Sequence, residues 1–510
     1  MQNTGKNMSD RSKNPRILIV TPEVTYLPEG MGNLANNLYA KAGGLADVSA
    51  ALISALFENG ADVHVAIPDY RSIYDGKLPP LLRQQRSIIR KKMPEDRIHL
   101  AEDRAFFYLH NVYSSYEWEN SKISLAFQRE VINNIVPRVQ PDLIHCNDWM
   151  TGLVPAMSRA MGIPCLFTIH NIFSVKKNLA EIEDRGIDAA TFWNFLFYER
   201  MPHNYEETRD NNKVDFLSSG VFASHFVNTV SPTFLLEVVD GHHRFVADNL
   251  KNEFANKCQA GCATGILNAP DPSYRPETDD ALFCQYDSKT QYKGKKANKK
   301  HLQMMLGLTE DENAPLFFWP SRLDTVQKGA QLLADILYST VSKYWKDNLQ
   351  IVFVANGEFE NHFKQIVWQF NLHNHVSVCG FDEKLSRLAY GASDYILMPS
   401  AFEPCGLPQM IGAIYGSIPV VHDVGGLHDT VEHLNVKKHT GNGFAFKTYD
   451  ANGLSWAIDQ VMEFHKLSES QKNMEISRIM AESQKRFNHS VTAREYIKLY
   501  EKMLERPFVS

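Results

Sequence analysis

Short apolar runs alternate with amphipathic helical patterns along most of this 510-residue chain. Strands buried in a parallel sheet are apolar on both faces, whereas the helices that cover the sheet have one apolar face. The alternation therefore predicts an α/β fold with parallel sheets covered on both faces. Strands are predicted at residues 17–20, 63–67, 143–145, 166–170, 226–230, 316–319, 351–354, 376–378, 395–398 and 419–422, with helices such as 329–344, 384–390 and 453–465 between them.

The length of the chain exceeds that of one ordinary hydrophobic core, so two α/β domains are expected. The predicted divisions are a disordered polar tail at 1–14, a first domain at 15–275, a linker at 276–300, a second domain at 301–488 and a final helix at 489–510 that packs back on the first domain. The linker contains the cationic run Lys293-Gly294-Lys295-Lys296, which is interpreted as solvated surface rather than a binding patch.

Composition narrows the class of protein. A net charge of −6 and a pI near 6.3 argue against a nucleic-acid partner bound through a basic surface. No apolar stretch is long enough to span a bilayer, and the polar start lacks a signal core, so a cytoplasmic protein without a membrane partner is expected. Seven cysteines are scattered through the chain, and only Cys258 and Cys262 are closely spaced, so reduced thiols and no metal site are expected.

The most informative motif is the segment Phe402-Glu403-Pro404-Cys405-Gly406-Leu407, followed closely by Gly425-Gly426-Leu427. It comes directly after the predicted strand 395–398 and opens into a helix, where backbone N–H groups favour an anion. An ionised Glu403 in such a loop can accept hydrogen bonds from several ligand hydroxyls. An alternative interpretation is that Glu403 is a helix N-cap residue followed by a turn glycine.

A second glycine-rich loop, Lys41-Ala42-Gly43-Gly44-Leu45, precedes the apolar-periodic stretch 48–57. Paired glycines let the backbone approach a ligand closely, and Lys41 supplies a point charge suited to phosphate. The glycine spacing matches neither the dinucleotide fingerprint nor the Walker loop. Two such loops in different halves of the chain suggest that both halves contribute to one cleft.

The ordered set of motifs resembles the bacterial glycogen synthases and plant starch synthases, which are retaining glycosyltransferases that use ADP-glucose. The resemblance extends from about residue 16 to about residue 501. It depends on the segments Lys41–Leu45, His145-Cys146-Asn147-Asp148-Trp149, Phe167-Thr168-Ile169-His170-Asn171, Asn228–Thr233, Gly265-Ile266-Leu267-Asn268, Pro276–Asp279, Ser321-Arg322-Leu323, Gln327-Lys328-Gly329, Gly380–Glu383, Phe402–Leu407 and Gly425–Leu427.

The resemblance implies a GT-B fold, in which two Rossmann-like domains with parallel sheets face a central cleft. It also implies a nucleotide-sugar donor, ADP-glucose, an α-1,4-glucan acceptor and no metal or other cofactor. The implied reaction moves glucose to the non-reducing 4-hydroxyl of the glucan with retention of configuration. No pair of carboxylates is evident that would flank a glycosidic bond, so a hydrolase is not expected.

The resemblance also assigns roles to single residues. Arg322 and Lys328 are similar to the cations that bind the donor diphosphate, where two fixed charges stabilise the transition state. Glu403 resembles the glutamate that holds the glucosyl ring, and His170 the histidine beneath it, although His170 also ends an apolar strand and a core histidine is the alternative. The remaining implied residues are Asp148 near the donor glucose or acceptor, Asn268 and Asn171 near the sugar, Phe381 on the adenine, and Lys41, Gly43, Gly44, Cys405, Gly406, Leu407, Gly425 and Gly426 around the nucleotide.

Several positions depart from the family pattern. Met150, Ser218, Ala401 and Pro408 replace more polar residues, and the interval from Arg322 to Lys328 has one extra residue, so that loop must bulge. About 15 extra residues, from about 25 to 39, precede the Lys41 loop. The departures leave two alternatives: a related transferase that uses UDP-glucose or a small acceptor, and a catalytically silent glucan-binding homologue.

Overall fold

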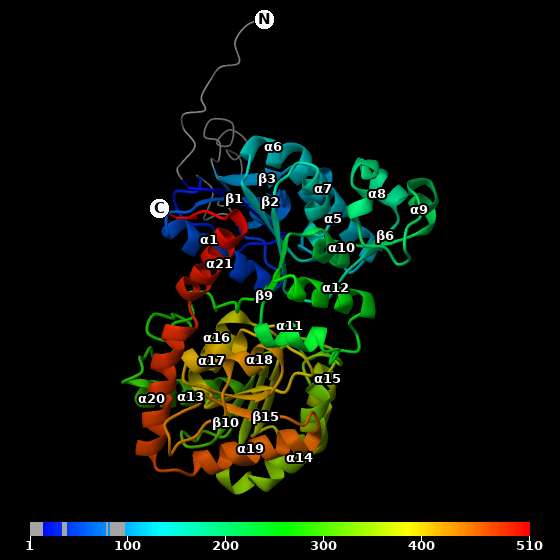
Figure 1. Ribbon diagram of the computed structural model, residues 1–510. Coiled ribbons are helices and arrows are strands. Elements are labelled where there is room, and N and C mark those ends of the chain that lie inside the picture. Colours follow the sequence, from blue (N-terminus) through cyan, green and yellow to red (C-terminus); the bar gives the residue numbers. More distant parts are fainter. Residues whose placement is uncertain (1–13, 33–37, 78–79, 82–96, 510) are drawn as a thin grey trace, which may run out of the picture. The chain divides into compact units, whose positions relative to one another are not determined.

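The computed structural model describes residues 14–32, 38–77, 80–81 and 97–509 (Figure 1). The chain divides into two compact units. The first comprises Met1–Val230, Val238–Ile266 and His489–Ser510, and the second comprises Ser231–Glu237 and Leu267–Asn488. Residues 1–13 of the predicted tail and residues 33–37 of the predicted insertion lie outside the part of the chain that the structure describes.

The first unit is built on a parallel seven-stranded sheet of order β3-β2-β1-β4-β5-β8-β9. Its strands are β1 (Arg16–Val20), β2 (Asp62–Pro68), β3 (Ile98–Ala101), β4 (Leu143–Asn147), β5 (Cys165–Ile169), β8 (Phe226–Thr229) and β9 (Ala263–Gly265). A two-stranded antiparallel pair joins β6 (Lys176–Lys177) to β7 (Val214–Asp215). The helices are α1 (Gly44–Glu58), α2 (Arg71–Lys77), α4 (Arg104–Phe107), α5 (Glu117–Glu130), α6 (Val136–Val139), α7 (Val154–Arg159), α8 (Leu179–Glu183), α9 (Tyr205–Asn211), α10 (Phe216–Ala223), α12 (Asp248–Gln259) and α21 (His489–Leu504).

The second unit is built on a parallel six-stranded sheet of order β12-β11-β10-β13-β14-β15. Its strands are β10 (Leu316–Trp319), β11 (Gln350–Val354), β12 (Val376–Cys379), β13 (Tyr395–Met398), β14 (Ile418–His422) and β15 (Phe444–Phe446). Its helices are α13 (Gln291–Leu306), α14 (Ala330–Lys343), α15 (Glu360–Gln369), α16 (Glu383–Ala392), α17 (Pro408–Ile414), α18 (Gly425–Thr430), α19 (Ala451–His465) and α20 (Glu469–Arg486); α11 (Pro232–Val239) spans the division between the units in sequence.

The central strands of the second sheet are buried on both faces, as is typical of a parallel sheet. Every residue of β10, β13 and β14 is buried, and the strands share one core with the inner faces of α14 and α19. Buried parallel strands of this kind need helical cover on both faces. Each of the ten predicted strands overlaps a strand of the structure, and the α/β prediction is confirmed.

The predicted linker, residues 276–300, instead belongs to the second unit. Its last ten residues form the beginning of α13. The prediction that the lysines of this segment are solvated is wrong for Lys295, which is buried, whereas Lys293 is exposed. The Lys295 ammonium donates to the carbonyls of Gly391 (3.3 Å) and Tyr415 (3.0 Å), at the C-terminal ends of α16 and α17. A cation is stabilised at such helix ends, and burial nevertheless lowers the pKa of Lys295 to about 7.

The last helix returns the chain to the first unit. Helix α21 contacts α1, and its two tyrosines bond to buried polar groups of the sheet. The hydroxyl of Tyr500 is 2.8 Å from Nδ1 of His145, and Asn228 donates to the hydroxyl of Tyr496 (2.9 Å). Buried polar groups need such partners, so α21 completes the core of the first unit.

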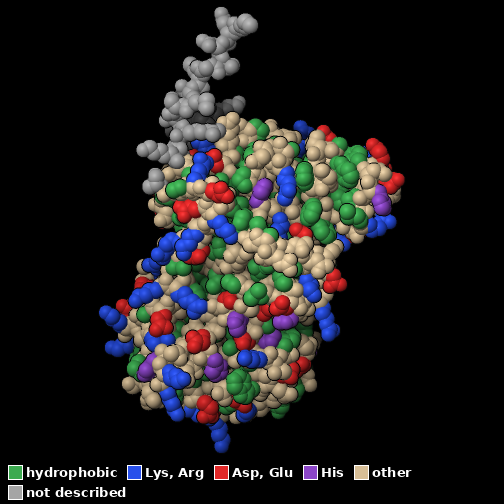
Figure 2. Space-filling model, viewed as in Figure 1, with side chains coloured by type: hydrophobic (Ala, Val, Ile, Leu, Met, Phe, Trp, Pro, Cys, Tyr) green, Lys and Arg blue, Asp and Glu red, His purple; other side chains and the backbone are tan. Residues whose placement is uncertain are grey.

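The surface carries charges of both signs. Figure 2 shows acidic and basic side chains interspersed over the visible face of each unit. Within the described residues, no helix is both long enough and apolar enough to cross a bilayer.

Candidate active site

Counted within its own unit, the second sheet has the strand order 3-2-1-4-5-6 of a Rossmann fold, and the first sheet has the same order with a seventh strand, β9, at its end. In such sheets the strand order reverses between the first and fourth strands, and ligands bind beyond the carboxyl ends of the strands at that point. The reversal lies between β1 and β4 in the first unit and between β10 and β13 in the second. Most of the predicted site residues lie on the segments that follow these four strands, and the others follow β5, β9, β12 and β14.

Asp148 follows β4 and has a strained backbone. Its φ of 59° and ψ of 177° lie in a region that residues other than glycine rarely adopt, at a cost of about 1–3 kcal/mol. Its carboxylate accepts hydrogen bonds from the backbone N–H of His170 (2.7 Å) and from the side-chain amide of Asn171 (3.2 Å). Burial raises the pKa of Asp148 to about 7. The structure thus brings together three residues predicted to lie near the sugar.

His170 lies at the end of β5 and is only partly buried. Its Nε2 is 3.0 Å from the amide oxygen of Asn147, and burial lowers its pKa to about 3, so the ring is neutral at pH 7. The core histidine of this region is His145, which is fully buried between Tyr500 and Thr168. His170 differs from it in being partly exposed.

The Lys41 loop is held by a carboxylate that the sequence analysis missed. Glu23, three residues beyond β1, is buried and accepts hydrogen bonds from the N–H groups of Ala42 (2.6 Å) and Gly43 (3.1 Å). Burial raises the pKa of Glu23. Lys41 itself pairs with Asp47 at 2.9 Å. The Gly43 amide, expected to face phosphate, therefore donates within the protein in this structure.

In the second unit the structure joins the two residues with the strongest predicted roles. Lys328, after β10, and Glu403, after β13, form an ion pair with 2.6 Å between Nζ and Oε2. Glu403 is 5% exposed and also accepts a hydrogen bond from the Ser400 hydroxyl (3.1 Å). A buried carboxylate requires such partners, and each ion here neutralises the other.

The loop between Arg322 and Lys328 forms a turn around Asp324. One carboxylate oxygen of Asp324 accepts hydrogen bonds from the N–H groups of Val326, Gln327 and Lys328, at 2.7–3.1 Å. This turn directs Lys328 toward Glu403. Arg322 is not brought to the pair: its side chain is 74% exposed and lies 3.8 Å from Asp324.

Gly425 and Gly426 have a packing role. The N–H of Gly426 donates to the carbonyl of Glu403 (2.9 Å), and the N–H of Gly425 donates to the carboxylate of Glu237 (2.8 Å), a residue the sequence analysis missed. A Cβ at Gly426 would lie 2.1 Å from the carbonyl oxygen of Cys405. Both amides donate within the protein in this structure, and the amide of Gly426 ties the Glu403 loop to the start of α18.

Replacement of Gly426 by Ala is therefore expected to displace the Glu403 loop. The clash involves backbone atoms, which cannot move away as a flexible side chain can. We expect the free energy of unfolding to fall by about 1–3 kcal/mol and activity to fall at least tenfold. Thermal unfolding and an activity assay measure both effects. Gly76→Ala is the control, since a Cβ there meets nothing within 4 Å, and equal behaviour of the two variants would contradict the assignment.

The other predicted residues lie on neighbouring segments of the second unit. Phe381, after β12, is 59% exposed, and its N–H donates to the side chain of Asn356 (2.8 Å). Asn268 is buried and its backbone hydrogen-bonds to the Cys405 thiol, whose pKa burial raises to about 12. Gly406 has a φ of +72°, a conformation that favours glycine.

The departures from the family pattern fit their surroundings. Met150 is buried in the core of the first unit. Ser218 lies in the first turn of α10, where its N–H is capped by Asp215. Pro408 is the first residue of α17, a position where the missing N–H costs nothing and the fixed φ favours the helix. The N–H of Ala401 donates to the carbonyl of Gln327 (2.7 Å), which links the two loops of the ion pair.

The chain has two units with the strand order of a Rossmann fold, and the candidate site residues lie on the loops after the strands. This arrangement is that of a GT-B glycosyltransferase. Comparison with known proteins agrees: residues 16–252 match the starch synthase catalytic domain family, and residues 307–477 match glycosyl transferases group 1. The chain is 32% identical to a glycogen synthase of Exiguobacterium sibiricum and 30% identical to one of Bacillus subtilis, covering 91% of this chain and 96% of each relative. The chain belongs to the glycogen synthase family.

Solved structures support the same family. The catalytic domain of starch synthase IV from Arabidopsis thaliana, bound to ADP and acarbose, has a TM-score of 0.75 and 26% identity, covering 97% of this chain and all of that one. A sucrose-phosphate synthase from Thermosynechococcus elongatus has a TM-score of 0.56 and 18% identity, covering 96% of this chain and 99% of that one, and shows the fold alone. The chain is therefore a hexosyltransferase that transfers glucose to a glucan; its family uses ADP-glucose and needs no metal cofactor.

Proposed function

We propose that this enzyme transfers glucose from ADP-glucose to the 4-hydroxyl at the non-reducing end of an α-1,4-glucan, with retention of configuration. The observation that carries the proposal is the buried Lys328–Glu403 pair at the point where the strand order of the second sheet reverses. The ADP and acarbose bound to starch synthase IV support a nucleotide and an oligosaccharide-like ligand for this chain as well.

Lys328 and Glu403 have separate roles in this proposal. The donor diphosphate takes Lys328 as its partner, and Glu403 is then released to accept hydrogen bonds from the glucosyl hydroxyls. An ionised carboxylate makes strong hydrogen bonds of this kind. The exposed Arg322 supplies a second cation for the diphosphate, so negative charge that develops on the departing ADP is stabilised.

In the first unit, the groups proposed to act on the sugar lie at the end of β5. His170 is neutral, so it can donate or accept one hydrogen bond without placing a positive charge beneath the sugar. Asp148 and Asn171 fix the end of β5 on which His170 lies. Lys41, beside the glycine loop, completes the cations proposed for the phosphates.

The proposed chemistry is a front-face displacement. The bond from C1 of glucose to the phosphate oxygen breaks, and the bond from C1 to the acceptor 4-oxygen forms on the same face of the ring. The proton of the acceptor hydroxyl passes to the departing phosphate, and ADP leaves. The protein stabilises charge and positions the reactants, and exclusion of water limits hydrolysis of the donor.

The proposal is tested by incubating the purified protein with glycogen and either ADP-glucose or UDP-glucose. We expect glucan elongation at a higher kcat/KM with ADP-glucose. A preference for UDP-glucose would overturn the donor assignment, because the stacking surface of Phe381 accepts either base. Glycogen binding without turnover of either donor would identify a catalytically silent homologue.

Asp148 gives a pH-dependent prediction. Its pKa is raised to about 7 in the folded protein, so the folded state binds its proton more tightly than the unfolded state. Stability is then lost as the pH rises from about 4 toward 7 and the carboxylate ionises in its buried site. Asp148→Asn is expected to raise the free energy of unfolding by roughly 1–3 kcal/mol at pH 8 and to change it little at pH 4.

Denaturant unfolding of both proteins at the two pH values measures this difference. Asp142→Asn is the matched control, because Asp142 is a partly exposed residue near the start of β4. Equal stabilities of Asp148→Asn and the parent protein at pH 8 would contradict the raised pKa. A gain in stability together with a loss of activity would assign the buried charge to function.

A further inference from the structure

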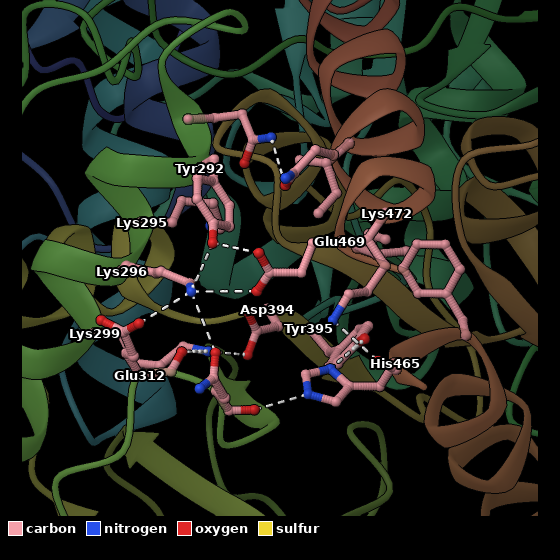
Figure 3. Close-up of a pocket in the computed structure, with 16 residues that line it drawn as sticks. Tyr292, Lys295, Lys296, Lys299, Glu312, Asp394, Tyr395, His465, Glu469 and Lys472 are labelled. Carbon is pink, nitrogen blue, oxygen red and sulfur yellow. Dashed lines mark hydrogen bonds and ion pairs between the residues drawn. The ribbon is translucent and has the colours of Figure 1, made fainter. Parts of the chain in front are cut away.

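The second unit contains a cavity at the amino ends of its strands. The Glu403 loop lies at their carboxyl ends. Tyr395 and Ile418, the first residues of β13 and β14, both line the cavity, whereas Glu403 lies beyond the far end of β13. Helix α13, the end of α19 and the start of α20 enclose it (Figure 3). Its volume of about 70 Å³ has room for several water-sized groups.

The walls of this cavity carry more cations than anions. Four lysines face three carboxylates, and burial lowers the pKa of the neighbouring His465, so that imidazole adds no charge at neutral pH. The excess is one positive charge when every lysine is protonated, and it is smaller at pH 7, where Lys295, with a pKa of about 7, is half protonated. The charged residues are Lys295, Lys296, Lys299, Lys472, Glu312, Asp394 and Glu469.

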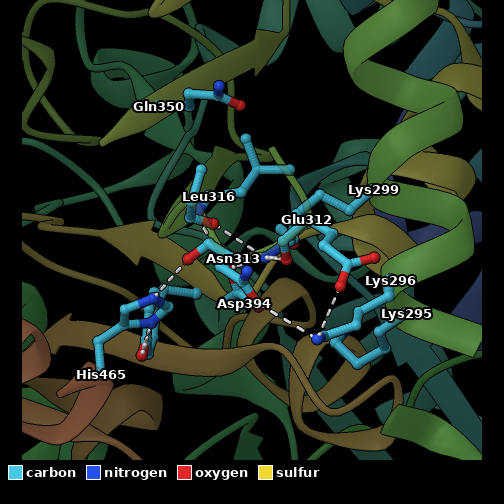
Figure 4. A network of polar contacts seen from close by, with 12 residues as sticks. Lys295, Lys296, Lys299, Glu312, Asn313, Leu316, Gln350, Asp394 and His465 are labelled. Atoms are coloured by element: carbon cyan, nitrogen blue, oxygen red, sulfur yellow. Dashed lines mark hydrogen bonds and ion pairs between the residues drawn. The ribbon is translucent and has the colours of Figure 1, made fainter. Parts of the chain in front are cut away.

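Two of the lysines are committed to the fold. Lys299 pairs with Asp394 at 2.6 Å and donates to the carbonyl of Ala314 (2.9 Å), and both side chains of the pair are largely buried (Figure 4). Lys295 donates to the helix-end carbonyls described above and to the hydroxyl of Ser417 (3.1 Å). These two lysines form the inner wall and are not available to a ligand.

The other two lysines can be released to a ligand at low cost. Lys296 contacts Glu312 (3.1 Å) and Glu469 (3.3 Å), whose side chains are 54% and 52% exposed. The two carboxylates face solvent, so both glutamates can turn outward, and the Lys296 ammonium, which is itself 21% exposed, then keeps its hydrogen bond to the side chain of Asn313 (3.2 Å). The Lys472 ammonium donates a hydrogen bond to a neutral acceptor, the carbonyl of His465 (3.0 Å).

A hydroxyl and a helix N-terminus lie beside these lysines. The hydroxyl of Tyr292 accepts a hydrogen bond from Nζ of Lys296 (2.9 Å) and donates one to Glu469, so its proton becomes available to a ligand when Glu469 turns outward (Figure 3). The cavity is also lined by Glu469 and Lys472, in the first turn of α20, an 18-residue helix. The partial positive charge of a helix N-terminus adds to the attraction for an anion.

We propose that this cavity binds a phosphate group, either inorganic phosphate or a phosphate monoester. Lys296, Lys472 and the Tyr292 hydroxyl hold its oxygens, and Glu312 and Glu469 turn outward as it enters. A tetrahedral dianion fits because it brings two negative charges to the two lysines and several acceptors to the surrounding donors. The site is separate from the Lys328–Glu403 pair and does not depend on the proposed reaction.

The test is the melting temperature in inorganic phosphate, compared with chloride at the same ionic strength. At about 10 mM phosphate the parent protein is expected to melt about 2–4 °C higher, because the ligand binds only the folded state. The double variant Lys296→Gln/Lys472→Gln is expected to lose this rise. Lys343→Gln is the matched control, since Lys343 is an exposed, ion-paired lysine of the same unit outside the cavity, and it should keep the rise.

The parallel variant Lys328→Gln separates the two candidate phosphate sites, and it should keep the rise. A rise that is lost in Lys328→Gln but kept in the double variant would overturn the proposal, as would no rise in the parent protein. If the double variant does not fold, Lys472→Gln alone must weaken phosphate binding at least about fivefold by calorimetry, and unchanged affinity would also overturn the proposal. Glycerol 2-phosphate distinguishes the sources: tighter binding than inorganic phosphate indicates a monoester, and weaker binding indicates the free ion.

Discussion

Glu403→Gln is expected to lower kcat by about 10²–10³ and to leave the protein folded, with a lower melting temperature because Lys328 loses its ion partner. Glutamine preserves the size of the side chain and one oxygen acceptor, so Ser400 can still donate to it. It removes the negative charge that makes the hydrogen bonds to the glucosyl hydroxyls strong and that stabilises positive charge at the reacting carbon. The initial rate of glucose incorporation into glycogen at saturating ADP-glucose measures the effect.

Glu360→Gln is the matched control for this variant. Glu360 forms an ion pair with Lys364 on the surface of α15, so its loss should leave kcat unchanged. Circular dichroism and the melting temperature establish that Glu403→Gln is folded. A folded Glu403→Gln variant with kcat within about threefold of the parent protein would assign Glu403 to structure instead of catalysis.

Lys328→Ala is expected to have the second large effect, a loss of about 10²–10³ in kcat/KM. The variant removes the cation proposed to stabilise the departing diphosphate, and it leaves Glu403 without its ion partner. Breaking a buried pair by removing one ion costs about 3 kcal/mol, so the melting temperature should also fall. Activity per folded molecule, measured below the melting temperature, separates the two effects.

The matched control is Lys343→Ala, because Lys343 pairs with Asp459 on an exposed surface of α14 and α19. Lys328 and Glu403 are in contact, so their effects should not add: the double variant should lose little more activity than either single variant. A Lys328→Ala variant that is fully active per folded molecule would contradict the proposed role of this cation.

Much of the fold follows from local sequence patterns. Strands such as 316–319 and 395–398 are continuous apolar runs bounded by helical patterns, and the structure has strands at the same residues. Strands β3, β9 and β15 are not predicted, because histidine, threonine or glycine interrupts or bounds their few apolar residues. The family and the GT-B fold follow from motifs whose order is fixed along the chain, and both are confirmed.

The candidate site was harder to predict, because its contacts join residues distant in sequence. Lys328 and Glu403 are each recognisable by motif, but their ion pair depends on the adjacent positions of β10 and β13 in the sheet. Glu23 and Glu237 lie outside the family motifs. Only the structure identifies them, because it shows the backbone amides from which their carboxylates accept hydrogen bonds. The prediction for Lys295 failed because local charge cannot show that helix-end carbonyls lie within reach of its ammonium.

The affinity for ADP tests the central claim most directly, namely that the diphosphate takes Lys328 from Glu403. In calorimetric titrations, Lys328→Ala should bind ADP at least about tenfold more weakly than the parent protein, because a desolvated cation at the diphosphate is lost. Glu403→Gln should bind ADP equally well or more tightly, because Lys328 no longer has to leave a carboxylate. Weaker ADP binding by Glu403→Gln, or unchanged binding by Lys328→Ala, would contradict the account.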